Sequence, residues 1–315
     1  MHLGNVFCAL LSWLSAKSQG GEWVLRIEDL DPQRSRKEYA LQLMDDLQWL
    51  GLPWDGEPVW QSQRGHIYEE YLLRLTEMGL TYPCFCTRAD IMATQAPHET
   101  DGRVVYKGTC RPRDIDAIGA IDSIGSIDST IRTVLATTRL IVPDRTIPFT
   151  DGHYGPHPLN LAEHCGDYIV RRKDGAWAYQ LAVVVDDALM GITEIVRGRD
   201  LLLSSPQQIH LRELLFFERK NNSLTIHRSP LTVNFFHHPL LCNAEGQRLC
   251  KRDKSMDLGY LRDKGTTPQE IIGLLAHLAG LTDTPASTTP AELLSFFSWD
   301  KVPTEDIILD KQIML

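Results

Sequence analysis

The hydrophobic pattern of the first eighty residues alternates between helical and extended periodicity. Apolar residues recur at helical spacing over Val6–Ser18, which predicts a helix that ends near Gly20 and Gly21. The next stretch, EWVLRIE, predicts a buried strand. Strands that alternate with helices in this way favour an α/β fold with a parallel, doubly wound sheet.

Two more helices are predicted in this region. Asp31 and Pro32 form an N-cap and first-turn pair that predicts the start of the first one, and Gly51 stops it. Its leucines share one face: Leu43, Leu47 and Leu50. The second helix spans about Gly65–Met78, and its predicted inward residues are Ile67, Tyr71, Leu72, Leu75 and Met78.

The pattern changes after Tyr82. The segment 116–129, DAIGAIDSIGSIDS, is a near-repeat of low complexity that we interpret as a surface insertion. Further along, DYIVRRKDGAWAYQLAVVVDD predicts a hairpin turning at Asp174 and Gly175, and GITEIVRGRD predicts a strand that ends at Arg197. Ser205–Gln208 has the pattern of a capping box before a helix to about Phe217, and helical patterns follow around 268–279 and 290–298.

Composition and charge narrow the class of protein. The 315 residues are 43% hydrophobic and 23% charged, as in ordinary globular proteins. A net charge of −9 argues against a surface that coats nucleic acid, although a local basic patch remains compatible with it. The seven scattered cysteines favour a reducing cytoplasm. No apolar run reaches the ~20 residues of a membrane span, and no Lys or Arg precedes the short apolar segment Val6–Leu14, so we expect neither a membrane segment nor export.

Two short stretches have the chemistry of phosphate binding. In HLGN (2–5), a glycine at a turn before a helix lets a nucleotide approach the backbone, and the helix N-terminus favours phosphates. In RLCKRDK (248–254), a mobile basic loop could close over a triphosphate. Each alone has a plain alternative, a surface turn for the first and a solvated loop for the second.

A cysteine cluster is the other candidate site. Cys84 and Cys86 are two residues apart and Cys110 follows, and thiolates at such spacing suit a tetrahedral zinc ion. The alternatives are a reduced cluster without metal, and a site in which His98 competes as a ligand. We expect three of the four other cysteines to be small core residues: Cys8, Cys165 and Cys242.

Together these motifs resemble the class I aminoacyl-tRNA synthetases. HLGN and LCKR resemble the two signatures of that class, and RIEDLDPQRS, AYQLAVVVDD, EIVRGRDLL and CNAEGQRLCKRDKS resemble its glutamyl-specific branch. The likeness covers most of residues 1–260 and is greatest to the shortened paralogues, which attach glutamate to the queuosine base in the anticodon of tRNA(Asp). It implies a Rossmann-like catalytic domain in two halves (1–80 and 161–242), a zinc-bearing insertion (81–160), and a signature loop with a small helical tail (243–315).

The resemblance also implies roles in ATP binding and zinc binding. His2 and Asn5 would contact the phosphates of ATP, which binds with Mg²⁺, and Gly4 would let the adenosine approach. Lys251 would neutralise charge on the α-phosphate as the glutamate carboxylate attacks it. Tyr106 would be the fourth ligand of a closed, structural zinc site.

Three residues match the glutamate pocket of the family. Glu28 would hold the amino group of the substrate, and Tyr179 and Arg197 would bind the rest of it, since an arginine fork suits a carboxylate. Two alternatives stay open: Glu28 could pair with Arg26, and Tyr179 could be a core aromatic residue.

The chain departs from the family pattern in two places. In the second signature Cys250 stands where a serine is usual, and Arg248 where a lysine is common. The first strand of the family and its Arg-x-x-Pro-Ser segment have no counterpart. Because a central strand of a parallel sheet cannot be removed without exposing the edges of its neighbours, we expect that the sequence begins at an internal methionine and that the site is incomplete.

Three functions are compatible with these observations. The first is a monomeric enzyme that activates L-glutamate with ATP and transfers it to tRNA(Asp) carrying queuosine. The second is a glutamyl-tRNA synthetase that charges tRNA 3′ ends, which the short tail after Asp257 disfavours. The third is a non-catalytic remnant that binds tRNA or nucleotide, which the absent strand and Cys250 favour.

Overall fold

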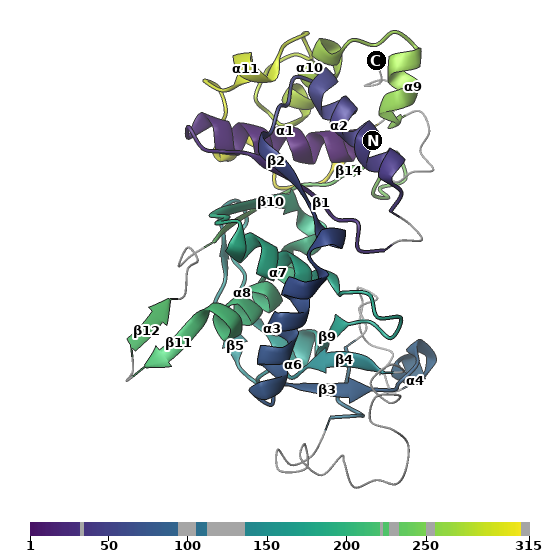
Figure 1. The fold of residues 1–315 in the computed structure, drawn as a ribbon. Helices are drawn as coiled ribbons and strands as arrows, with labels where there is room; N and C mark the ends of the chain where they lie inside the picture. Colours follow the sequence, from purple (N-terminus) through teal and green to yellow (C-terminus); the bar gives the residue numbers. More distant parts are fainter. Residues whose placement is uncertain are drawn as a thin grey trace, which may run out of the picture.

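The computed structural model describes residues 1–31, 35–93, 105–111, 136–220, 223–226, 233–249 and 256–309. The two ends of the described chain lie side by side in the upper half of Figure 1, and the middle of the chain forms the lower half. The upper helices are α1 (Leu3–Ser18), α2 (Lys37–Trp49), α9 (Leu258–Asp263), α10 (Pro268–Leu278) and α11 (Pro290–Leu293). The lower helices are α3 (Gly65–Glu77), α4 (Arg88–Ala93), α6 (Leu161–His164), α7 (Tyr179–Leu189) and α8 (Ser205–Phe216).

The lower half also contains an antiparallel sheet and several short strands. The sheet has the order β3–β4–β9, with β3 (Thr81–Cys84), β4 (Thr137–Leu140) and β9 (Tyr168–Arg171). The other short elements of the chain are β5 (Thr146–Ile147), β6 (Thr150–Asp151), β7 (Gly155–Pro156), β8 (Leu159–Asn160), β11 (Phe217–Lys220), β12 (Ser223–Ile226), β14 (Leu241–Cys242), β15 (Ile307–Ile308), η1 (Gln61–Gln63), η4 (Arg199–Ser204) and η6 (Trp299–Lys301). Of these, β14, its partner β15 and η6 pack in the core of the upper half.

Two pairs of parallel strands lie between the halves. β1 (Val24–Ile27) pairs with β2 (Asp55–Trp60), and β10 (Glu194–Gly198) pairs with β13 (Asn234–His238). Within the described residues each pair is a separate two-stranded sheet. A third, shorter parallel pair joins β14 to β15. The parallel pairing predicted from the sequence is therefore confirmed, but within the described residues it occurs in separate two-stranded pieces.

A groove of about 570 Å³ lies between β1 and β10. Both strands line it, with Arg26 and Glu28 from the end of β1 and Arg197 from β10, and α1 and α7 close it on either side.

The core of the upper half explains why α1 forms and where it sits. The buried residues of α1 recur at three- and four-residue spacing: Leu3, Val6, Phe7, Leu10, Leu11 and Leu14. They belong to one cluster with buried residues of α10, among them Ile271 and Leu275. Each fully buried side chain of this kind contributes ~1.5–3 kcal/mol, so the C-terminal helices stabilise the position of α1.

A buried carboxylate joins α3 and α7 in the lower half. Asp186 on α7 is fully buried and accepts hydrogen bonds from Gln61 Nε2 (2.9 Å), Arg64 Nε (2.6 Å) and Tyr68 Oη (2.7 Å). A buried charge is tolerated only when it is paired and hydrogen-bonded, and this one satisfies both conditions. The contacts fix the chain after β2 against α7, and hence the end of the β1–β2 sheet.

Most helices lie where the sequence predicts them, with corrections at their ends. α2 begins at Lys37, with Arg36 as its N-cap, and not at Asp31 and Pro32. Asp31 instead forms an ion pair with Arg172, with 3.4 Å between the charged atoms. Residues 32–34, His98 and the segment 116–129 lie outside the described residues.

Two other predictions about helices were wrong in detail. Met78, predicted to face inward, is 51% exposed, and Tyr68 faces the core instead because its hydroxyl reaches Asp186. The N-cap of α8 is Ser204 rather than Ser205, since the hydroxyl of Ser205 is hydrogen-bonded to Arg197. The turn at Asp174 and Gly175 is confirmed, with Gly175 at a φ of 82°.

Candidate active site

Arg197 lies at the centre of the candidate active site. It stands at the carboxyl end of β10 and is only 8% exposed. Its Nη1 donates to Gln208 Oε1 (2.8 Å) and to the Tyr179 hydroxyl (3.4 Å), and its Nη2 donates to Ser205 Oγ (2.8 Å). Within the described part of the chain no carboxylate lies within ion-pair distance of this guanidinium, so its buried charge has only neutral partners.

Tyr179 and Glu28 lie beside Arg197, at the place where β1 and α7 approach each other. Tyr179 is the first residue of α7 and is 40% exposed, which rules out the alternative of a plain core aromatic residue. Burial of its phenol raises the pKa of Tyr179, so the hydroxyl keeps its proton at neutral pH. Glu28 accepts a hydrogen bond from Arg26 Nη2 (3.1 Å), as the structural alternative expected, while Arg26 Nη1 also donates to Asp187 (2.5 Å). Glu28 therefore pairs with Arg26 and still lines the cavity next to Tyr179.

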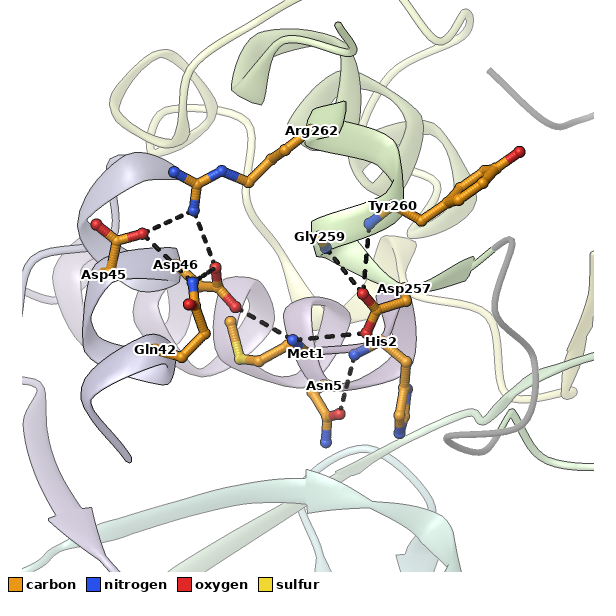
Figure 2. Close-up of polar contacts among 10 residues, drawn as sticks. All are labelled: Met1, His2, Asn5, Gln42, Asp45, Asp46, Asp257, Gly259, Tyr260 and Arg262. Carbon is orange, nitrogen blue, oxygen red and sulfur yellow. Dashed lines mark hydrogen bonds and ion pairs between the residues drawn. The ribbon is translucent and has the colours of Figure 1, made fainter. Parts of the chain in front are cut away.

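The N-terminus of α1 is held by contacts with α2 and with the start of α9 (Figure 2). The backbone N–H of His2 donates to Asn5 Oδ1 (3.4 Å), and His2 forms a bridge with Asp257. The amino group of Met1 donates to Asp46, which also accepts a hydrogen bond from Arg262 (3.0 Å). In Figure 2 the side chains of His2 and Asn5 extend to the same side of the helix N-terminus, away from Asp45 and Asp46.

Gly4 is the second residue of α1, since the helix begins at Leu3 with His2 as its N-cap and not at Val6 as the sequence predicts. A Cβ added at Gly4 would come within 3.0 Å of the His2 ring. A larger residue at this position would therefore displace His2. The structure thus places His2, Gly4 and Asn5 together, as the HLGN motif predicts.

The second signature is described only at its two ends. Residues 250–255, including Cys250 and Lys251, lie outside the described residues. Before them, Leu249 N donates to Leu241 O (3.0 Å) and Arg248 forms an ion pair with Asp200. After them, Leu258 N donates to Met1 O (2.7 Å). Leu258, on the far side of these residues, is therefore held next to the residues that begin the HLGN motif.

The three cysteines predicted to bind metal converge in the lower half. The sulfur atoms of Cys84, Cys86 and Cys110 all lie within 4.8 Å of one another, and those of Cys86 and Cys110 are 3.5 Å apart. The Tyr106 hydroxyl is 3.4 Å from the sulfur of Cys84 and 3.8 Å from that of Cys86. In a tetrahedral zinc site with Zn–S bonds of about 2.3 Å, the sulfurs stand about 3.8 Å apart. The donor set and its spacing therefore fit zinc.

Tyr106 links this cysteine cluster to the cleft. It forms a bridge with Gly166, where a φ of 62° and a close backbone exclude a side chain, because a Cβ there would lie 2.1 Å from Tyr106 O. The guanidinium of Arg139 lies 3.8 Å from the centre of the Tyr106 ring. The ring also lines the cavity that contains Glu28 and Tyr179. Tyr106 thus connects the cysteine cluster to one wall of this cavity.

Four further residues around Arg197 escaped the sequence analysis. Ser205 and Gln208 bind its terminal nitrogens, and His237 on β13 and Asp151 on β6 lie behind it. Ser205 and Gln208 had been assigned to a helix cap, and nothing in the sequence connects Asp151 with His237. The register of β10 against β13 pairs Arg197 with His237, and this can be known only from the fold.

Within the described residues no helix is both long and apolar enough to cross a membrane.

Comparison with known proteins defines the class to which this fold and site belong. The family described as tRNA synthetases class I (E and Q), catalytic domain, matches residues 1–289. The chain belongs to this family, and its α/β fold and parallel strands are those of a class I synthetase catalytic domain.

Individual relatives are more specific. The chain is 41% identical to a protein of Symbiobacterium thermophilum called glutamyl-Q tRNA(Asp) synthetase, over 98% of this chain and 91% of the relative. A protein of the same name from Nitratidesulfovibrio vulgaris is 38% identical over 100% of this chain and 93% of the relative. A crystal structure of a glutamate tRNA ligase from Elizabethkingia meningosepticum, in complex with its amino acid, matches with a TM-score of 0.75 and 25% identity. This chain is covered completely in that comparison and spans 65% of the ligase chain.

Proposed function

We propose that the protein activates L-glutamate with ATP and transfers the glutamyl group to the queuosine base of tRNA(Asp). The observation that carries the proposal is the guanidinium of Arg197, which is buried at the end of a parallel strand with only neutral partners. A buried cation needs an anion, and the side-chain carboxylate of glutamate provides one of the right shape for an arginine fork. Relatives named for this activity align over nearly the whole chain.

The groups around Arg197 can select glutamate by its two ends. Arg197 would bind the side-chain carboxylate, and the Tyr179 hydroxyl, already in contact with Arg197, would add a second hydrogen bond. Glu28 is 42% exposed at the carboxyl end of β1, lines the same groove as Arg197 and Tyr179, and would bind the substrate ammonium group. The ion pair with Arg26 would then orient the carboxylate of Glu28, which would still be able to bind the ammonium group of the substrate.

The activation step needs orientation and charge neutralisation but no covalent enzyme intermediate. A carboxylate oxygen of glutamate bonds to the α-phosphorus of ATP as pyrophosphate leaves. His2 and Asn5, which extend to one side of the turn before α1, would contact the phosphates, and Gly4 leaves room for the adenosine. Lys251 of the second signature would neutralise the α-phosphate, and Mg²⁺ would accompany ATP.

The transfer step needs space for a nucleobase beside the adenylate. A cavity of about 750 Å³ begins at Glu28 and Tyr179 and extends along the wall that contains Tyr106 and Trp177. Aromatic faces and the guanidinium of Arg172 suit an extruded base with its polar substituents. The glutamyl group would pass to the base there as AMP leaves.

The cysteine cluster would hold a structural zinc ion. Cys84, Cys86, Cys110 and Tyr106 offer four donor atoms at the spacing of a tetrahedral site, which leaves no open position for catalysis. Bound zinc would fix the wall of the base cavity through Tyr106.

A glutamyl-tRNA synthetase is the second candidate, since a glutamate tRNA ligase has a similar structure. The relatives named glutamyl-Q tRNA(Asp) synthetase are more similar in sequence, and the chain spans 91% and 93% of their length against 65% of the ligase. These values favour transfer to queuosine.

Glutamate-dependent exchange of pyrophosphate into ATP, measured without tRNA, tests the activation step. We expect exchange with glutamate and none with aspartate or glutamine. Exchange with glutamine equal to that with glutamate would contradict the assigned role of Arg197. No exchange with any amino acid would favour the non-catalytic alternative.

A further inference from the structure

A buried chain of hydrogen bonds lies behind Arg197. Arg197 Nε donates to His237 Nε2 (3.1 Å), and His237 Nδ1 lies 2.6 Å from Asp151 Oδ2. His237 is fully buried and Asp151 is 2% exposed. The other oxygen of Asp151 accepts from the backbone N–H groups of His153 (3.0 Å) and Tyr154 (2.9 Å). The whole chain is therefore held by β6, β13 and β10 away from solvent.

The direction of each hydrogen bond in this chain is fixed by chemistry. An arginine side chain only donates, so His237 Nε2 must be an acceptor and carry no proton. The proton of a neutral imidazole then sits on Nδ1, where it is donated to Asp151. Hydrogen bonds from His237 and from the backbone keep the pKa of Asp151 below its usual value although burial opposes this. Asp151 is therefore a permanent acceptor that selects this tautomer.

We propose that Asp151 and His237 are positioning residues for glutamate recognition: they keep a neutral imidazole whose Nε2 holds Arg197 in the orientation that presents its guanidinium to the substrate. This inference rests on the proposed function, because it gives Arg197 a substrate carboxylate to bind. Without the pair, Nε of Arg197 loses its acceptor, and the orientation of the guanidinium is set only by the hydrogen bonds of its two terminal nitrogens.

The surroundings of His237 predict how the pair responds to pH. The charged and titratable groups around it are Asp151 from β6, Arg197 from β10, Asp200 from η4 and His238 from its own strand, with neutral Ser205 from α8. Burial lowers the pKa of His237, against the opposing effect of Asp151. Protonation would place an N–H of the imidazolium against the N–H of Arg197. The affinity for glutamate should therefore fall as the pH falls below the usual pKa range of histidine. The affinity for ATP should not show this pH dependence, because ATP binds to other groups.

Asp151→Asn separates this role from simple packing. The oxygen of the introduced amide would stay with the backbone N–H groups, which need an acceptor, so the amide N–H would face Nδ1 of His237. That forces the proton onto Nε2, against Arg197. We expect the KM for glutamate in pyrophosphate exchange to rise ~10- to 150-fold, as for loss of a hydrogen bond to a charged group, with the KM for ATP changed less than about twofold.

His237→Gln is the conservative partner of this variant. A glutamine can place its carbonyl oxygen near the position of Nε2 and accept from Arg197, so the KM for glutamate should stay within about fivefold of the wild type. The dependence of this KM on acidic pH should disappear, because the titrating group is gone. His210→Gln is the matched control, since His210 is also buried, at 5% exposed, but lies on α8 without contact to Arg197. It should leave both KM values within about twofold.

Three kinetic outcomes would overturn the proposal. These are an unchanged glutamate KM in Asp151→Asn, equal rises in the KM for glutamate and for ATP, and a glutamate KM in His237→Gln as high as in Asp151→Asn. If the wild type shows no exchange at all, the proposed function fails by itself, and the kinetic comparison no longer bears on the pair.

Nitrogen NMR of histidine-labelled wild-type protein tests the pair independently of activity. The signal of His237, identified by its loss in His237→Gln, should show a neutral ring with the proton on Nδ1 at pH 7. A proton on Nε2, or a charged ring at this pH, would overturn the inference whatever the enzyme assays show.

Discussion

Replacing Arg197 by alanine should raise the glutamate concentration needed for activation and leave the ATP requirement almost unchanged. The guanidinium is 8% exposed and makes four hydrogen bonds to neutral groups, at 2.8 Å to Gln208 and Ser205, 3.1 Å to His237 and 3.4 Å to Tyr179. Within the described residues no carboxylate competes for it, so the charge is available to the substrate. A hydrogen bond to a charged group contributes ~1.5–3 kcal/mol, which corresponds to a rise of about 10- to 150-fold in the KM for glutamate.

The assay is glutamate-dependent pyrophosphate exchange over a range of glutamate and ATP concentrations, with thermal unfolding of each variant as a check on folding. Arg145→Ala is the matched control, because Arg145 forms an exposed ion pair with Glu213 on the outer side of α8. It should change neither KM by more than about twofold. A glutamate KM within threefold of the wild type in Arg197→Ala would refute the assignment of Arg197, and so would an equal rise in the KM for ATP.

Three further predictions follow from contacts elsewhere in the molecule. Purified protein, kept reduced and free of chelator, should contain about one zinc per chain by elemental analysis. Cys110→Ser should lose most of this zinc, whereas the control Cys242→Ser, remote from the cluster, should keep it. Wild-type protein without metal would refute the site. Asp186→Asn should lower the free energy of unfolding, measured by urea titration, by about 3 kcal/mol, because it removes one partner of a buried ion pair. The control Asp174→Asn, at an exposed ion pair, should change this free energy by less than about 0.5 kcal/mol. Equal effects of the two substitutions would contradict the role of Asp186. Burial lowers the pKa of His210 and of His238 to about 4, so the unfolded chain binds protons from about pH 6.5 downward while the folded chain does so only near pH 4. The free energy of unfolding should therefore fall by about 3 kcal/mol per histidine between these pH values, and His210→Gln should make the fall smaller; a slope equal to that of the wild type would contradict this.

The sequence predicted the elements whose signals are local. Helical spacing located α1, α2 and α3, the alternation of strands with helices predicted parallel pairing, and the spacing of Cys84 and Cys86 predicted the cysteine cluster. The glycines Gly51 and Gly175 marked the end of a helix and a turn, because both adopt a positive φ.

The errors arose where tertiary contacts override local signals. Ser205 has the local pattern of a cap, but its hydroxyl binds Arg197, and Ser204 takes the cap position. Tyr68 faces the core because Asp186, far away in sequence, needs its hydroxyl, and Met78 is displaced to the surface. Asp151 and His237 have no local signature, since strand register alone brings them behind Arg197.

The domain boundaries, the roles of His2, Gly4, Asn5 and Lys251, and the monomeric state stay predictions. The segment with Lys251 lies outside the described residues, and the role of Lys251 is the one that the family resemblance implies. Lys251→Ala should lower the turnover of activation more than it raises the KM for glutamate, because the lysine is assigned to the charge that develops on the α-phosphate.

Transfer of labelled glutamate to tRNA tests the central claim most directly. The protein is incubated with ATP, labelled glutamate and one of three RNAs: tRNA(Asp) with queuosine, tRNA(Asp) without it, and tRNA(Glu). Label should appear on the queuosine-containing tRNA(Asp) alone, and it should survive oxidation of the tRNA 3′ end before the reaction. Label on tRNA(Glu) that is abolished by this oxidation, with none on tRNA(Asp), would contradict the account and identify an enzyme that charges 3′ ends.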